Sequence, residues 1–161
     1  MICVLEEALE SYDTMRLTEG ARLIDDILEN LKLILENVAK IEKLAPASVK
    51  AYEQRIKSKM IEALDGKDYD PQRLITEAAI FADRIDVGEE TVRLKSHISQ
   101  FRSLIEGSTE PVGKKLDFII QEMNREINTI GSKCSSYEIT KLVVDTKSVI
   151  EKIREQIQNI E

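Results

Sequence analysis

The chain has 161 residues, of which 42% are hydrophobic and 33% charged, and its net charge is −7. An acidic chain is not attracted to nucleic acid as a whole, so any RNA contact requires a local basic patch or a bound cation. With only six glycines and three prolines, the composition excludes the many turns of a β-sandwich or small barrel and favours an all-helical protein.

The first predicted element is a long helix over about residues 4–44, which contain no proline. Apolar residues recur there at alternating steps of three and four, the spacing of a packed helical seam. They are Ile24, Ile27, Leu31, Ile34, Val38 and Ile41. Gly20 inside this pattern suggests a close crossing or a bend. A helix of about 40 residues is about 60 Å long, more than its own chain can cover, so we expect a homo-oligomer.

Pro46 is expected to end or kink this helix, because it pushes Ala45 away from the helical region. The helical pattern resumes and continues to Leu64, so the two segments form an antiparallel hairpin or one kinked rod. The clearest break follows at residues 65–71, with Asp70 as N-cap and Pro71 at the first helical position. These breaks predict a long helical hairpin over residues 1–66 and a helical bundle over 67–161.

The predicted bundle contains helices over 71–85, 88–106, 112–130 and from about 135 to the end. The expected inward residues of the first of these are Leu74, Ile75, Ala78, Ala82 and Ile85. The third has one apolar stripe, formed by Leu116, Ile119, Ile120, Met123, Ile127 and Ile130. Gly131 is a natural C-terminal cap for it. The predicted fold is therefore all-α, a long helical hairpin followed by a shorter bundle.

The polar side of the helix over 112–130 carries Glu122 and Glu126 one turn apart, with Arg125 opposite the core stripe. One interpretation is a solvated face with ion pairs between neighbouring turns. The other starts from Asn124 and Asn128, which are poor helix formers. Amides and paired carboxylates on one helix suit a cation or a sugar–phosphate backbone.

His97, the only histidine, lies near the inner edge of the helix over 88–106, on a stripe with Glu90 and Arg93. It is either a hydrogen-bonded boundary residue or a general acid or base. Glu89 and Glu90 are explained by the preference of a helix start for acids.

Two segments resemble the bacterial YicC family: FADRIDVGEETVRLKSHISQF at 81–101 and PVGKKLDFIIQEMNREINTIGSK at 111–133. The tail VVDTKSVIEKIREQIQNIE and the early MRLTEG fit the same family, so the resemblance covers essentially the whole chain. Family members carry a further N-terminal domain, so the chain looks like their C-terminal helical part. Lys114 and Cys134 stand where the family pattern has Arg and Ser.

The resemblance implies a stress-related endoribonuclease of the bacterial cytoplasm that depends on manganese or magnesium and forms ring-like hexamers. It also implies turnover of small regulatory RNA, with RNA-degradation machinery as a further partner. On this basis the candidate catalytic residues are His97, Glu122 and Glu126, and the two glutamates are also the candidate metal ligands. The candidate RNA-binding residues are Arg93, Lys114, Lys115, Arg125 and Lys133.

These candidates require a particular geometry. The helices over 88–106 and 112–130 should meet so that His97, Glu122 and Glu126 line one polar cleft, with Arg93 and Arg125 at its rim. Compensation of the glutamates by lysine or arginine is the alternative to a metal. The alternative function is a non-catalytic oligomerisation or RNA-holding adaptor module. The outward-facing Phe118 supports a partner surface under either function.

Cys3 and Cys134 have no paired spacing, which argues against a disulfide framework or zinc knuckle and favours a reduced intracellular setting. Apolar runs are too short to cross a bilayer, and the N-terminus has acids where a signal peptide needs bases. The sequence thus predicts a soluble cytoplasmic protein without a membrane partner.

Overall fold

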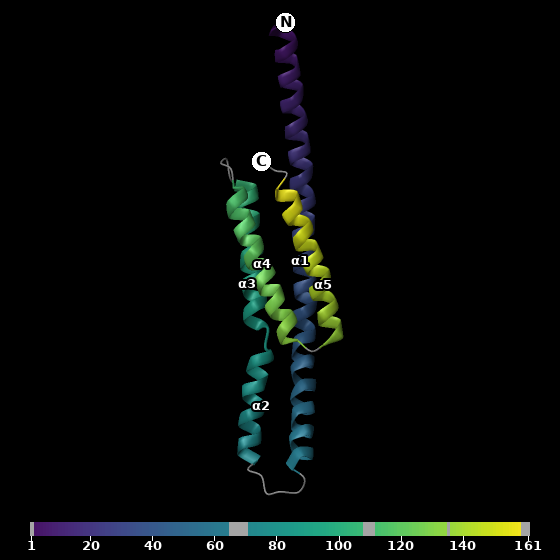
Figure 1. The fold of residues 1–161 in the computed structure, drawn as a ribbon, viewed down its shortest axis with the longest axis vertical. Helices are drawn as coiled ribbons and strands as arrows, with labels where there is room; N and C mark the ends of the chain where they lie inside the picture. Colours follow the sequence, from purple (N-terminus) through teal and green to yellow (C-terminus); the bar gives the residue numbers. More distant parts are fainter. Residues whose placement is uncertain (1, 65–70, 108–111, 135, 159–161) are drawn as a thin grey trace.

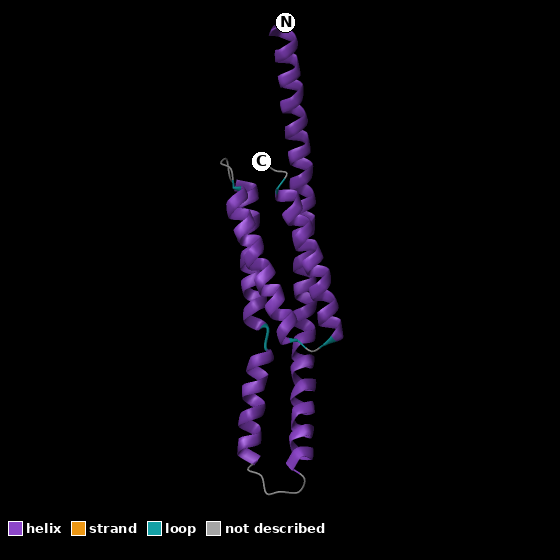
Figure 2. Cartoon of the chain, in the orientation of Figure 1, coloured by secondary structure: helices purple, strands orange, loops and turns teal. Residues whose placement is uncertain are grey.

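The computed structural model describes residues 2–64, 71–107, 112–134 and 136–158. Within these ranges the chain is helical apart from short connections (Figure 2). The helices are α1 (Ile2–Leu64), α2 (Pro71–Ile85), α3 (Gly88–Gly107), α4 (Gly113–Lys133) and α5 (Tyr137–Ile157). The predicted all-α class is confirmed. In the part of the chain that the structure describes, no helix is long and apolar enough to cross a membrane.

α1 is one continuous helix that runs through Pro46. The prediction that Pro46 separates two antiparallel helices is therefore wrong. Of the alternative prediction, one kinked rod, the structure confirms that the two segments form one rod. Proline lacks the N–H that would bond to the carbonyl of Glu42, which costs about 3 kcal/mol in a helix interior. Packing offsets this cost, because α1 contacts α2, α3 and α5 and because Ile41 and Ala45, just before the proline, are buried.

α2 runs beside the C-terminal part of α1 and forms the hairpin (Figure 1). The predicted domain boundary at 66–67 and the Asp70 cap lie in 65–70, outside the described residues. Ile75 was expected to point inward but is 57% exposed, because a helix that packs along one neighbour buries only a narrow face. The side chains of Leu74, Ala78 and Ala82 lie outside the described set, and Ile85 is half-buried.

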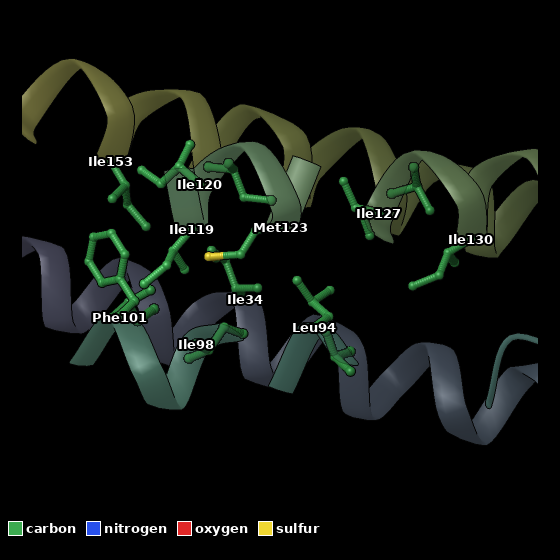
Figure 3. Packing of buried hydrophobic residues seen from close by; sticks show 14 of the residues in the cluster. Ile34, Leu94, Ile98, Phe101, Ile119, Ile120, Met123, Ile127, Ile130 and Ile153 are labelled. Carbon is green, nitrogen blue, oxygen red and sulfur yellow. The ribbon is translucent and has the colours of Figure 1, made fainter. Parts of the chain in front are cut away.

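The hydrophobic core lies between the middle of α1 and the helices α3, α4 and α5. In this bundle α1 packs against α3 and α5, and α4 packs against α3 and α5. Figure 3 shows side chains from these four helices pointing toward one another, among them Ile34 of α1, Phe101 of α3 and Met123 of α4. The predicted α1 seam is buried from Ile27 to Ile41, with Ile24 half-buried, and all six residues of the predicted α4 stripe are buried. One core therefore joins α1 to the helices that follow it.

The N-terminal part of α1 extends beyond the other helices (Figure 1). A Cβ added at Gly20 would meet no atom within 4 Å, so the close crossing expected there is absent from the described chain. Among the side chains of this extension that the structure describes, the large exposed apolar ones are Leu9, Tyr12, Met15 and Leu17.

α4 continues through Gly131 to Lys133, so the predicted cap at this glycine is wrong. The glycine has a different role, because a Cβ at this position would lie 3.1 Å from Cγ1 of Val143 in α5. Gly131 therefore permits the close approach of α4 and α5 near the C-terminal end of α4.

Candidate metal centre

The candidate site lies along the seam between α3 and α4, which pack side by side in opposite directions (Figure 1). On α3, His97 lies at the edge of the face that buries Leu94 and Phe101. On α4, Glu122 and Glu126 flank the buried stripe on the side facing α3. Residues that border the core on two antiparallel helices meet across the seam, which places these three side chains together.

A nitrogen of His97 and one carboxylate oxygen each from Glu122 and Glu126 lie within 4.8 Å of one another. Glu126 is 5% exposed, and the other two residues are half-buried. Oxygen ligands lie about 2.0–2.6 Å from a divalent cation, so two donors on opposite sides of one ion are about 4–5 Å apart. The three residues therefore fit a single divalent cation with little movement, and His97 offers a third donor beside the two predicted ligands.

Arg93 and Arg125 lie next to the carboxylates, one on each helix. Nη1 of Arg93 is 3.9 Å from Oε1 of Glu126, and Nη1 of Arg125 is 3.9 Å from Oε2 of Glu122. These separations exceed a hydrogen bond, so both contacts are loose ion pairs. Arg93 is also paired with Glu89. The arginines balance part of the negative charge without saturating the two carboxylates, which leaves oxygens for a cation.

The remaining predicted cations have different surroundings. Lys114 and Lys115 are exposed in the first turn of α4. Lys133 Nζ instead lies 2.6 Å from Oε1 of Glu90 and donates a hydrogen bond of 2.9 Å to the carbonyl of Asp86. Lys133 is therefore not the free surface cation that the sequence suggested, because its ammonium joins the end of α4 to the start of α3.

Glu90 is the residue of this region that sequence reasoning undervalued. Its side chain is 7% exposed, and its Oε2 is buried without a hydrogen-bond partner among the described residues. The sequence did indicate that Glu90 is buried, because Glu90 shares a helix stripe with His97 at the edge of the core. The preference of a helix start for acids explains only exposed carboxylates. A buried carboxylate that is bonded through only one oxygen depends on its single cation to compensate its charge.

Cys134 lies next to this ion pair. Burial, followed by the Glu90 carboxylate, raises the pKa of the Cys134 thiol, while Lys133 acts in the opposite direction. The thiol is therefore protonated near neutral pH, which makes it a poor nucleophile.

Residues 41–161 match the family model described as "Endoribonuclease YicC-like, C-terminal". The chain belongs to the YicC-like family. The matched range contains all of α3 and α4, so every residue of the candidate centre lies within the part of the chain that defines the family. The family resemblance seen in the sequence is thereby confirmed.

Two curated relatives extend this similarity over nearly the whole chain. A Clostridioides difficile (strain 630) protein named "Probable endoribonuclease YicC" is 46% identical over 158 residues, 98% of this chain and 54% of the relative. A Haemophilus influenzae protein of the same name is 36% identical over 161 residues, 100% of this chain and 55% of the relative. The YicC-like chain thus spans about half the length of the curated relatives it matches.

Proposed function

We propose that the YicC-like chain contributes a metal-dependent endoribonuclease site at the α3–α4 seam and that it cleaves phosphodiester bonds of RNA. The observation that carries the proposal is the convergence of His97, Glu122 and Glu126 within 4.8 Å. The names of the two relatives supply the reaction class. Neither carboxylate is bound tightly to an arginine, which favours a cation over ion pairing alone.

A divalent cation bound there would polarise the phosphoryl group as a Lewis acid. Glu122 and Glu126 would hold it with oxygen, and His97 with nitrogen. A mixed nitrogen and oxygen set suits manganese better than magnesium, which prefers oxygen ligands and retains its waters. We therefore propose manganese as the preferred ion.

The surrounding cations would overcome the repulsion between RNA and a chain of net charge −7. Arg93 and Arg125, at the rim, would bind the phosphate at the cleaved bond, because a guanidinium matches phosphate oxygens in bidentate fashion. Lys114 and Lys115 would bind phosphates further along the strand. Lys133 would contribute through helix packing, since its ammonium is already bound to Glu90.

We also propose that the chain forms a homo-oligomer through the N-terminal extension of α1, where exposed apolar residues have no cover from the described chain. A cyclic arrangement is usual for such contacts, and the family resemblance favours a hexamer. Turnover of small regulatory RNA in the cytoplasm under stress, with RNA-degradation machinery as partner, remains a prediction from the same resemblance.

The test is cleavage of an end-labelled RNA by the purified chain with Mn²⁺, with Mg²⁺ and with EDTA. Glu122→Gln and Glu126→Gln should each lower the rate on the order of 100-fold, since an amide is a poor replacement for a metal-bound carboxylate. Glu138→Gln, a matched change at an exposed position of α5, should leave it unchanged. RNA binding without product under every metal condition would instead establish the RNA-holding adaptor.

His97→Ala separates two roles for the imidazole. If His97 binds the cation, the variant should require more Mn²⁺ for half-maximal rate. If His97 only transfers a proton, the variant should lower kcat at saturating Mn²⁺ without changing the metal requirement.

A further inference from the structure

Phe118 is an exposed aromatic residue on the outer face of α4. It is 63% exposed and is the only large hydrophobic residue of α4, all of which is described, to be exposed. Phe118 precedes Glu122 by four residues, so the two lie about 6 Å apart along the helix axis and share one side of α4. An exposed phenyl ring therefore borders the candidate metal centre.

The charged neighbours of Phe118 on α4 include more cations than carboxylates: Lys114, Lys115 and Arg125 against Asp117 and Glu122, and Glu122 is loosely paired with Arg125. Lys114 lies one turn before it and Arg125 two turns after it on the same side of the helix, and the Arg125 side chain is 75% exposed. The nearby carboxylate of Asp117 accepts a hydrogen bond of 2.8 Å from Gln121 and lies 3.6 Å from Nε of Arg154. Its charge is thus partly balanced, so the surface around the ring favours an anionic ligand.

The exposed ring and the surrounding cations together indicate the chemical class of the ligand. A protein interface has a core of several apolar side chains, whereas Phe118 has none beside it on this helix face. Nucleic acids present flat bases and phosphates together, and single strands are bound by aromatic rings that stack with bases within a basic surface. A single exposed ring with cations around it is therefore typical of a surface that binds single-stranded nucleic acid.

We propose that Phe118 is a stacking platform for an unpaired base of RNA. The proposal rests on the proposed function and specifies its substrate class: RNA that is single-stranded at the cleaved bond. In a duplex both faces of each base are covered by neighbouring bases, so the ring could stack only on a base that leaves the helix. Because Phe118 lies one turn from Glu122, the stacked base belongs to a nucleotide adjacent to the bond at the metal centre.

Phe118→Trp allows stacking to be measured without cleavage, because the chain contains no tryptophan. The variant is titrated in EDTA with a short single-stranded RNA, with the same sequence as a duplex, and with a strand of abasic ribose phosphates. Only the single strand with bases should quench the fluorescence. Tyr137→Trp, at an exposed site on α5, is the control and should respond to none of the three.

Affinity provides the second measurement. Phe118→Ala and Phe118→Leu should each weaken binding of the single strand about 5- to 100-fold, while Phe118→Tyr should retain it, because stacking requires an aromatic ring. Quenching without cleavage in the presence of metal would support stacking and refute the enzyme. Cleavage that proceeds equally in Phe118→Ala and wild type, without quenching, would overturn stacking and retain the enzyme. A fluorescence shift that depends on protein concentration alone would assign the ring to a second copy of the chain and also overturn the proposal.

Discussion

Substitution of Lys133 by methionine should destabilise the fold far more than its surface location suggests. Lys133 holds the buried Glu90 carboxylate at 2.6 Å, and the other oxygen of that carboxylate has no partner among the described residues. Methionine keeps the length of the side chain and removes the ammonium. The variant therefore leaves a carboxylate that is 7% exposed without its charge partner.

Loss of one partner from a buried ion pair costs about 3–5 kcal/mol. The Lys133 side chain is 27% exposed, so some water can replace the ammonium, and we expect about 3 kcal/mol. For a chain of this length, 1 kcal/mol corresponds to about 2–4 °C in Tm, which gives a decrease of about 6–12 °C. Glu90→Gln should cost less, because the remaining lysine reaches both water and the Asp86 carbonyl.

Thermal unfolding followed by circular dichroism measures these changes. Lys57→Met is the matched control, since Lys57 is paired with Glu53 at 2.8 Å within α1 and both side chains are more than a third exposed. Pairs that water reaches in this way contribute about 0–1 kcal/mol. Combining Lys133→Met with Glu90→Gln should recover part of the stability lost in Lys133→Met alone, because no unpaired charge remains. A Lys133→Met variant as stable as Lys57→Met, or strictly additive effects of the two changes, would refute this reasoning.

The further predictions concern the Cys134 thiol and the assembly of the chain. In a Cys3→Ser background, Cys134 should react with iodoacetamide more slowly in the folded chain than in urea, because burial and Glu90 raise the pKa of its thiol. Glu90→Gln should accelerate the reaction of the folded chain. Equal rates in the folded chain, in urea and in the Glu90→Gln variant would contradict a raised thiol pKa. For the same reason, the contribution of this half-buried thiol to stability should be present below the ordinary pKa of a cysteine thiol and lost as the pH rises through its raised pKa in the folded chain. Urea titrations at several pH values can measure this loss. Deletion of residues 1–20 should lower the mass measured by light scattering while preserving the helical spectrum, whereas a full-length monomer at micromolar concentration would end the assembly proposal.

The sequence predicted helices and their buried faces well where spacing alone decides the outcome. The seam from Ile27 to Ile41 and the α4 stripe are buried as predicted, because a period near 3.6 residues fixes which side of a helix faces the core. Local signals were less reliable where packing opposes them. Pro46 and Gly131 both lie inside helices, since contacts with other helices outweigh a lost hydrogen bond or a low helix propensity.

The candidate site was partly predictable, because the helical period also fixes which polar residues border the buried faces. His97, Glu122 and Glu126 each border a predicted core stripe, so antiparallel packing of two helices is enough to bring them together. The partner of Lys133 was not predictable, because whether a lysine reaches water or a buried acid depends on the offset between α3 and α4. That offset is set by how side chains interlock along the whole interface.

The claim on which the proposed function depends is that His97, Glu122 and Glu126 bind one divalent cation. Because His97 is the only histidine of the chain, its imidazole protons give a single set of NMR signals that reports on this site directly. Substoichiometric paramagnetic Mn²⁺ should broaden these signals in the wild type and in Glu138→Gln, and should leave them sharp in Glu126→Gln. Imidazole signals that stay sharp in the wild type at millimolar Mn²⁺, or broaden equally in all three proteins, would contradict a metal centre at the α3–α4 seam.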